Sequence, residues 1–234
     1  MKSSFKEKKP YYLIIARKVI FWLVLLIFGI AIWLLLTKDD VNKGRIIFTM
    51  VQLVGMLFVL RIPQFIKDKY HFEIPNLLDF FLISFAFSSL ILGDVFNFYG
   101  KIPYWDSILH TLSGVLIAYI GFIIIEFLDK EYTIPLSVSP LFMCMIVVSV
   151  ALAIGAVWEI AEYTVDDIFK TNNQQYMQTT RSTLYNEEDV PLQGHEALAD
   201  TMKDLMLDLG GAVSVAMIEY KHIEKKQKKA LLNK

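Results

Sequence analysis

Long stretches without a charged residue constrain this chain more than any other feature of its sequence. The first runs from Val19 to Thr37, and roughly 20 consecutive apolar residues are what a helix needs to cross ~30 Å of hydrocarbon. Charged residues make up 20% of the chain, yet most of them lie near the two ends and in one late loop. This distribution predicts an all-α, polytopic membrane helix bundle.

Six segments meet or approach this requirement, which predicts about six transmembrane helices. They are 19–37, 46–62, 77–95, 107–127, 141–163 and about 204–220. The sixth segment is the weakest because Asp204 and Asp208 interrupt it, and charged residues penalise insertion into a bilayer. Its alternative is an amphipathic helix that lies on the membrane surface. The whole membrane domain is expected to cover 19–220.

The positions of Lys and Arg predict the orientation. Both the N-terminal segment 1–18 and the tail 221–234 are rich in these residues, and positively charged flanks stay on the cytoplasmic side. Six spans satisfy this requirement, with the polar loop 170–199 then outside. A basic start before an apolar run is also typical of a secretory signal. The run is long and no small-residue cleavage pattern precedes Lys38, so we expect an uncleaved anchor.

The composition argues against several other classes of protein. The chain has 23 basic and 24 acidic residues, a balance that gives no support to a nucleic-acid partner. The single Cys144 excludes an intramolecular disulfide framework and a cysteine-rich metal site. No nucleotide loop, nucleophile elbow or zinc-protease motif is present. The expected partner is therefore the lipid bilayer, and no motif demands an oligomer.

Pairs of ionisable residues spaced three or four apart occur near the ends of three predicted spans. Such spacing places both side chains of a pair on one face of a helix. The pairs are Asp106 with His110, Glu159 with Glu162, and Asp204 with Asp208. With six spans, all three pairs lie on the outer side of the membrane and can meet. Converging acids repel one another, so a metal, shared protons or a bound cation is needed to offset the repulsion.

We therefore predict a metal-binding or proton-sharing site near the outer membrane face. One imidazole among several carboxylates suits a hard or borderline divalent ion such as Mg, Mn or Zn. The candidate ligands are His110, Glu159, Glu162, Asp204 and Asp208, with Asp106 as a further member of the polar site. Such a metal activates water or holds a phosphate group.

Other polar residues and the glycines have simpler explanations. Helix capping and pairing at the headgroup level explain the outermost acids equally well. These acids are Asp106, Asp166, Asp167 and Asp200. Capping or snorkelling explains Asp79 and Asp94, and His195 is expected to be solvated. Close packing between helices is expected at Gly114, Gly121, Gly155, Gly210 and Gly211.

Three motifs in this order carry a resemblance to a known family. They are Trp105-Asp106-x-x-x-His110-x-x-Ser113-Gly114, Trp158-Glu159-x-x-Glu162, and Asp200-Thr201-x-x-Asp204-x-x-x-Asp208-x-Gly210-Gly211. Over roughly 77–220 the chain resembles the YjdF-type bacterial inner-membrane proteins and, more distantly, the VanZ-like family. The resemblance implies a bacterial plasma-membrane protein that acts on the cell envelope. Asp208 departs from the VanZ-like pattern, which often has Asn there. The metal prediction comes from the residues and not from the family.

Three functional hypotheses follow from the acidic, His-containing site. The first is a metal-dependent membrane enzyme that acts on a lipid-linked or phosphate-bearing envelope component. The second is a proton- or cation-coupled transporter that uses the same carboxylates as a relay. The third is a structural or partner-binding membrane protein without chemistry. The same groups serve all three, so the sequence does not choose between an enzyme and the alternatives.

Overall fold

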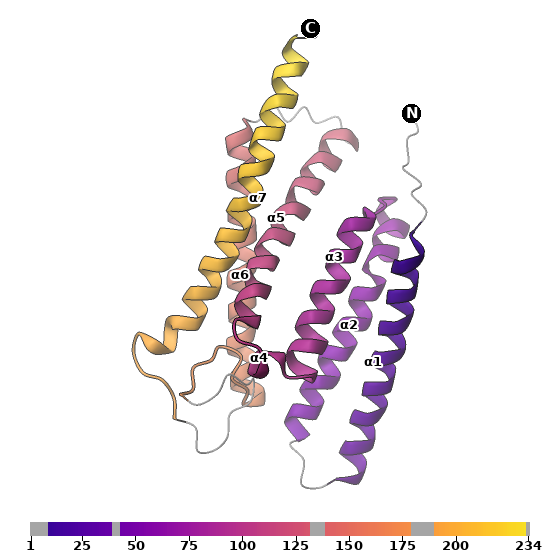
Figure 1. Ribbon diagram of the computed structural model, residues 1–234, viewed down its shortest axis with the longest axis vertical. Helices are drawn as coiled ribbons and strands as arrows, with labels where there is room; N and C mark the ends of the chain where they lie inside the picture. Colours follow the sequence, from indigo (N-terminus) through magenta and orange to yellow (C-terminus); the bar gives the residue numbers. More distant parts are fainter. Residues whose placement is uncertain (1–8, 39–42, 132–138, 179–189, 233–234) are drawn as a thin grey trace.

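The computed structural model describes residues 9–38, 43–131, 139–178 and 190–232 and is helical in nearly all of them (Figure 1). The helices, in chain order, are α1 (Tyr11–Thr37), α2 (Lys43–Tyr70), α3 (Asn76–Ala86), η1 (Phe87–Val95), α4 (Phe98–Lys101), α5 (Trp105–Glu131), α6 (Pro140–Phe169), η2 (Glu196–Leu198) and α7 (Ala199–Leu232). The described residues contain no strand, only an isolated bridge between Met177 and Pro191. The prediction of an all-α helix bundle is confirmed.

The long helices form two groups, each with its own core. Helices α1, α2, α3 and η1 enclose one apolar cluster, which includes Val24, Leu53 and Ile91. Helices α5, α6 and α7 enclose a second cluster of smaller side chains such as Ala118 and Ala151. Figure 1 shows α5, α6 and α7 side by side and the group of α1, α2 and α3 beside them. The site described below lies where the two groups meet.

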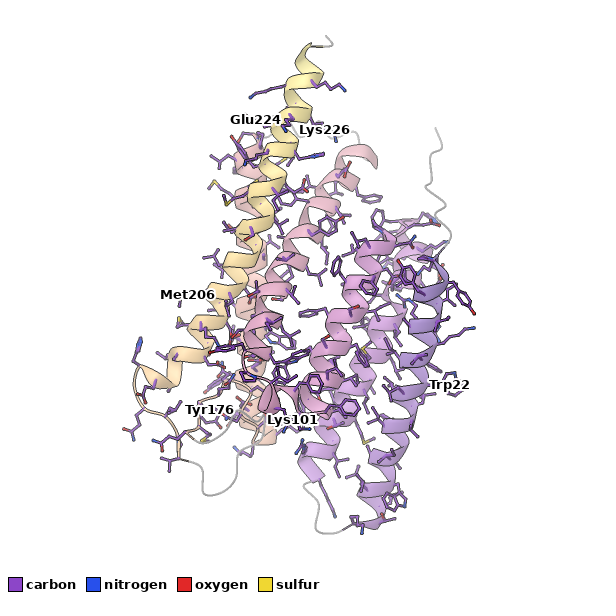
Figure 2. The ribbon with its side chains drawn as sticks, in the orientation of Figure 1. Trp22, Lys101, Tyr176, Met206, Glu224 and Lys226 are labelled. Atoms are coloured by element: carbon purple, nitrogen blue, oxygen red, sulfur yellow. The ribbon has the colours of Figure 1, made fainter. Side chains whose placement is uncertain are left out.

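Five helices are long and apolar enough to cross a membrane by length and composition: α1, α2, α3 with η1, α5 and α6. Their outward side chains are apolar, as the 67% exposure of Trp22 on α1 illustrates (Figure 2). Helix α7 does not meet this composition criterion. Its acids Asp204 and Asp208 are only 1% exposed, whereas Met206 between them is 65% exposed and points away from α5 and α6 (Figure 2). The polar face of α7 is therefore turned into the bundle.

Both described ends of the chain lie at the same end of the bundle. Figure 1 marks the N-terminus and the C-terminus at its top, and the connection from α6 to α7 lies at the bottom. We call the bottom the loop end and the top the terminal end. Lys101 and Tyr176 lie at the loop end, and Glu224 and Lys226 at the terminal end (Figure 2).

Local sequence explains how α6 and the third span are shaped. The side chain of Ser139 accepts a hydrogen bond from the backbone N–H of Phe142, and Pro140 follows at the first helical position, so α6 begins there. It ends at Lys170, which has the left-handed conformation typical of a helix C-terminus. The third span begins as α3 and continues as the π-helix η1, a geometry that is rare and frequently occurs at functional sites. Tyr99 of α4 packs against Gly93 of η1.

Close approach of α5 and α7 depends on two glycines. A Cβ added at Gly114 would lie 2.9 Å from the Cα of Asp208, and one at Gly211 would lie 2.9 Å from the backbone nitrogen of Val115. Real Cβ atoms do not approach backbone atoms this closely, so only glycine fits. Packing against neighbouring helices is confirmed at these two positions and at Gly121 and Gly155. A Cβ at Gly210 would meet nothing within 4 Å, so the prediction is wrong there.

Asp79 connects α1 to α3 near the terminal end. Its side chain is 0% exposed, so neither simple capping nor snorkelling describes it. The Lys9 Nζ lies 3.0 Å from its carboxylate, and the Arg17 guanidinium donates to the same group. Arg17 also donates to the backbone carbonyl of Leu60 on α2. This buried ion pair joins the three helices of the first group.

Candidate functional site

The ends of α5, α6 and α7 converge at the loop end and bring four predicted acids around the imidazole of His110. Helix α5 supplies His110 and Asp106 from its first two turns, α6 supplies Glu159, and α7 supplies Asp204 and Asp208. The spacing of three or four residues within each pair is what places these side chains on the faces that meet. We call these five residues the His110 cluster.

The two ring nitrogens of His110 have different neighbours within the cluster. The Nδ1 atom lies 3.3 Å from Asp208 Oδ2, within hydrogen-bond reach. The Nε2 atom lies 3.7 Å from Asp106 Oδ1, 3.9 Å from Glu159 Oε1 and 4.0 Å from Asp204 Oδ2. These three distances are too long for hydrogen bonds. The Nε2 atom therefore faces three carboxylates without bonding to any of them.

Asp208 is fixed tightly in the angle between the three helices. Ser113 donates a hydrogen bond to its Oδ1. On the other side, a Cβ at Gly155 of α6 would lie 2.6 Å from its Oδ2, so only glycine leaves room for the carboxylate. Because Asp208 is held from α5 and α6 and bonds to Nδ1, it orients the His110 ring.

Two acids of the cluster are buried without a hydrogen-bond partner. Glu159 is 4% exposed and Asp204 is 1% exposed, and none of their four carboxylate oxygens has a partner. Buried acceptors without hydrogen bonds are costly because they have lost their water, and here each faces the His110 imidazole, at 3.9 Å from Glu159 and 4.0 Å from Asp204. Asp106, His110 and Asp204 also offer ligand atoms that all lie within 4.8 Å of one another. These three residues form a group that could hold a metal ion.

The polar segment after α6 covers the cluster at the loop end. Gln175 donates to Asp106 Oδ2 at 3.1 Å, and Gln174 donates to the Glu159 backbone carbonyl and to Thr201. Asp166 holds this segment by accepting hydrogen bonds from Thr171, Asn173 and Gln174. Those bonds are 2.6 Å from Thr171 Oγ1, 2.8 Å from each of two Asn173 nitrogens, and 3.0 Å from Gln174 N.

Two cavities lie beside the cluster, between the two groups of helices. The first, the polar chamber, has a volume of about 160 Å³ and lies toward the α6–α7 connection. The second, the apolar cavity, has a volume of about 220 Å³ and extends along α5 as far as Ile117. Five residues line both and form the junction: Ser89, Tyr99, Asp106, Trp158 and Glu162. The junction lies next to His110, which lines the apolar cavity.

The remaining predicted acids take different positions. Glu162 lines both cavities and accepts a 2.9 Å hydrogen bond from the Trp158 indole, so it stands beside the cluster and not among the groups nearest His110. Asp167 is solvated and pairs with Lys170. Asp166 is buried and holds the loop that follows α6, so capping at the solvated headgroup level does not describe it. His195 is exposed, as expected. Part of the predicted loop 170–199 lies outside the described residues.

Two groups outside the spans have shifted pKa values. Burial, followed by repulsion from Asp106, raises the pKa of Asp200 to about 7, and Lys203 at 3.9 Å lowers it only in part. Burial also raises the pKa of the Tyr99 phenol well above its ordinary value, and Asp94 adds to this effect. Tyr99 therefore stays a neutral hydroxyl, 3.1 Å from Ser89 Oγ.

Sequence reasoning missed the polar side chains that the first helix group and the loop bring to the cavities. Gln52 and Ser89 are lone polar residues in apolar spans, and an amide at mid-span is a signal that could have identified Gln52. Gln174 and Gln175 lie in a polar loop where nothing marks them. Tyr99 belongs to α4, a short helix that no periodicity predicts.

Comparisons with known proteins agree with a membrane protein. The family model described as "Predicted membrane protein (DUF2238)" matches residues 19–225, which include the whole His110 cluster. A Thermotoga maritima protein described as "Uncharacterized protein" is 32% identical to this chain over 160 residues, which is 68% of this chain and 70% of that protein. No solved structure matches the chain.

Proposed function

The chain belongs to the DUF2238 family of predicted membrane proteins, and from this premise we propose that it binds a divalent metal ion in the His110 cluster and uses it on a phosphate-bearing, lipid-linked component of the bacterial envelope. The proposed ligands are His110 Nε2 and the carboxylates of Asp106, Asp204 and Glu159. Asp208 is proposed to orient the imidazole. The distances within the cluster favour ligation by these four residues over ligation by Asp208 or Glu162.

The observation that carries this proposal is the pair of buried carboxylates without partners. Glu159 and Asp204 lose their hydration in the bundle, and neither has a hydrogen bond in compensation. Their oxygens face the same ring nitrogen at 3.9 and 4.0 Å. Two ligand atoms that are each about 2.1 Å from one ion can be at most roughly 4.2 Å apart, so these separations fall just inside that limit and the side chains would move closer together around a bound ion.

The donor set favours a hard or borderline ion. One imidazole with carboxylate oxygens suits Mg, Mn or Zn, and none of the described cluster residues supplies sulfur. A metal here would polarise a phosphate oxygen or lower the pKa of a bound water. The chain's own contribution is to orient His110 through Asp208 and to limit water at the site through the segment that carries Gln174 and Gln175.

The proposed location is the bacterial plasma membrane, with both termini in the cytoplasm and the cluster at the outer face. Six crossings with α7 as the last are supported by two observations. Both ends of the described chain lie at the terminal end (Figure 1). In addition, α7 packs along α5 and α6 with its acids inward, and its outward residues from Met202 to Ile218 include many exposed apolar side chains. A helix lying on the surface would present its acids to water.

A cation- or proton-coupled transporter is less favoured. Carboxylates of Asp106, Glu162 and Asp208 line the apolar cavity, which a relay would require. However, the deeper lining of that cavity includes Phe85 and Ile117, so within the described residues the polar path does not continue toward the terminal end. Cation or proton flux in proteoliposomes that Asp208→Asn abolishes would favour this alternative over the metal-dependent reaction.

The test of the proposal is metal content by elemental mass spectrometry on purified protein. We expect about one ion per chain, lost from a His110→Ala, Asp204→Asn variant and kept by Asp167→Asn, which removes an exposed acid from the same end. Asp208→Asn should weaken metal binding about tenfold or more without abolishing it. Calorimetry with inorganic phosphate should then give binding to the metal-loaded protein and none in EDTA. Metal-free wild-type protein that also fails to bind added Mg, Mn or Zn would disprove the proposal.

A further inference from the structure

The polar chamber is acidic and contains no cation in its described lining. Three carboxylates line it, from Asp94, Asp106 and Glu162, and none of the described residues around it is Lys, Arg or His. Without a bound metal ion, a phosphate or another anion would be repelled by these carboxylates. Carboxylates with low-dielectric walls instead attract positive charge. The chamber therefore selects for a cationic group.

The hydrogen-bonding groups that line the chamber favour a ligand that donates hydrogen bonds. Gln52 is 8% exposed and lines the chamber. Its Nε2 donates to Asp94, and its carbonyl oxygen has no partner. The carboxylates only accept hydrogen bonds, and the donors of Trp158 and Gln175 are already bonded to Glu162 and Asp106. An ammonium group offers three donors and no acceptor, and thus matches both the charge and the hydrogen-bonding pattern.

The spacing of the acids favours an organic cation over a bare metal ion. Among the described residues, only Asp106, His110 and Asp204 bring three ligand atoms within 4.8 Å of one another. Asp94 and Glu162 belong to no such group, so a single ion cannot reach the chamber's carboxylates together. An ammonium group on a carbon chain is larger, and the aromatic rings of Trp158 and Tyr99 at the junction suit it through cation–π contact.

The apolar cavity provides room for hydrocarbon next to this chamber. From Asp106 to Ile117 it follows α5 for about 16 Å, or eleven residues, which is about half the hydrocarbon thickness. Its apolar lining includes Phe85, Leu109, Ile117 and Ile154. Ile154, which lines this cavity, is itself 46% exposed. The cavity therefore reaches a residue of the bundle surface and offers room for part of a lipid chain.

We propose that the two cavities form one site for a phospholipid whose headgroup ends in a primary ammonium group, with the ammonium in the polar chamber and an acyl chain in the apolar cavity. This places the phosphate at the junction, beside Asp106 and the His110 cluster. The placement of the phosphate rests on the proposed metal function. The selection for ammonium and for hydrocarbon does not, because it follows from the lining of the cavities alone.

The experiment compares three dioctanoyl phospholipids that share their acyl chains and phosphate. The delipidated protein in detergent is titrated with phosphatidylethanolamine, with its N-acetylated analogue and with phosphatidylglycerol, and binding is measured by native mass spectrometry. We expect phosphatidylethanolamine to bind about tenfold or more tightly than the other two, because only it carries the ammonium. The titrations are repeated in EDTA. The preference for ammonium should persist there, even if removal of metal weakens all three lipids equally.

Variants test each cavity separately. Glu162→Gln and Asp94→Asn keep side-chain shape and should each reduce the preference for ammonium about tenfold, whereas Asp167→Asn, an exposed acid of the same helix as Glu162, should not. Ile154→Trp fills the apolar cavity and should weaken all three lipids. Its matched control is Ile160→Trp, because Ile160 is 64% exposed on the same helix and lines neither cavity.

Each outcome decides the inference. Equal binding of the three lipids would show a nonspecific lipid coat and overturn it. Tighter binding of phosphatidylglycerol would indicate a hydroxyl-bearing headgroup and overturn the assignment of ammonium. If Ile160→Trp and Ile154→Trp weaken lipid binding equally, the apolar cavity is not where the acyl chain binds. Preference for ammonium in protein that binds no metal would support this inference and reject the proposed metal function, so the two failures are distinguishable.

Discussion

At the scale of single residues, the adjacent glycines of α7 show how the contact between helices decides what a position tolerates. Gly210 and Gly211 look equivalent in the sequence. A Cβ at Gly211 would press on the backbone of Thr111 and Val115, whereas one at Gly210 would meet open space. Of these two glycines, only Gly211 is needed, together with Gly114 of α5, for the close approach that brings Asp204 and Asp208 to His110.

We predict opposite effects for alanine at these two positions. Gly211→Ala should lower the free energy of unfolding by about 2 kcal/mol or more, because α5 and α7 must separate. Gly210→Ala should leave it unchanged or raise it by up to about 1 kcal/mol, because alanine is the better helix former. Thermal unfolding of the purified proteins, followed by circular dichroism, measures the difference. Equal destabilisation by both changes would contradict the packing described for α7.

At the scale of the elements, a buried ion pair holds α1 against α3. Asp79 is buried, and Arg17 is mostly buried beside it, with side-chain exposures of 1% and 18%. Burying two charges gains little in net stability, but leaving one of them without its partner is costly. The pair therefore fixes how α1 docks more than it strengthens the bundle.

A double-mutant cycle tests this interpretation. Asp79→Ala should destabilise the protein by about 3 kcal/mol, because it leaves the Arg17 guanidinium buried without its counter-ion. Adding Arg17→Met should recover part of that loss, since a flexible apolar side chain then fills the space. Thermal unfolding in detergent gives both values. Additive losses in the double variant would mean that the two side chains act independently.

Also at the element scale, the mean hydropathy of α7 does not reveal where its charged side chains point. The helix fails a composition criterion because of its charged residues, yet two of its acids point into the bundle and Met206 points outward. The mean hydropathy of a segment does not depend on which face of the helix carries a charge. The packing of α7 against α5 and α6 does depend on it.

At the scale of the whole molecule, the two described ends of α7 should lie on opposite sides of the membrane. In a Cys144→Ala background, which removes the protein's single cysteine, we predict that a membrane-impermeant maleimide labels His195→Cys in intact cells. Lys225→Cys should react only after lysis. Both replaced side chains are exposed, so burial does not limit the reaction. Labelling of both positions in intact cells would place α7 on the membrane surface and reject the sixth crossing.

Much of the fold and about half of the site environment could be predicted from the sequence. The uncharged runs predicted helices in the right places because the backbone in a bilayer must satisfy its own hydrogen bonds. The spacing of Asp106 with His110 and of Asp204 with Asp208 predicted shared faces because helix geometry is local. The helix bounds differ from those predicted. The first helix begins at Tyr11 and not at Val19, since interfacial residues extend a helix beyond its apolar core.

What the tertiary structure alone decided is which groups meet. His110 turns one nitrogen to Asp208 and the other to Asp106, Glu159 and Asp204, and no spacing within one helix predicts that division. Gln52 reaches the polar chamber from α2, far away in the sequence, and Tyr99 lines both cavities from the short helix α4. The sequence by itself determined the helices and their polar faces, because these depend on neighbours within a turn or two. Cavities and contacts between helices depend on docking between distant segments, so they exist only once the chain has folded.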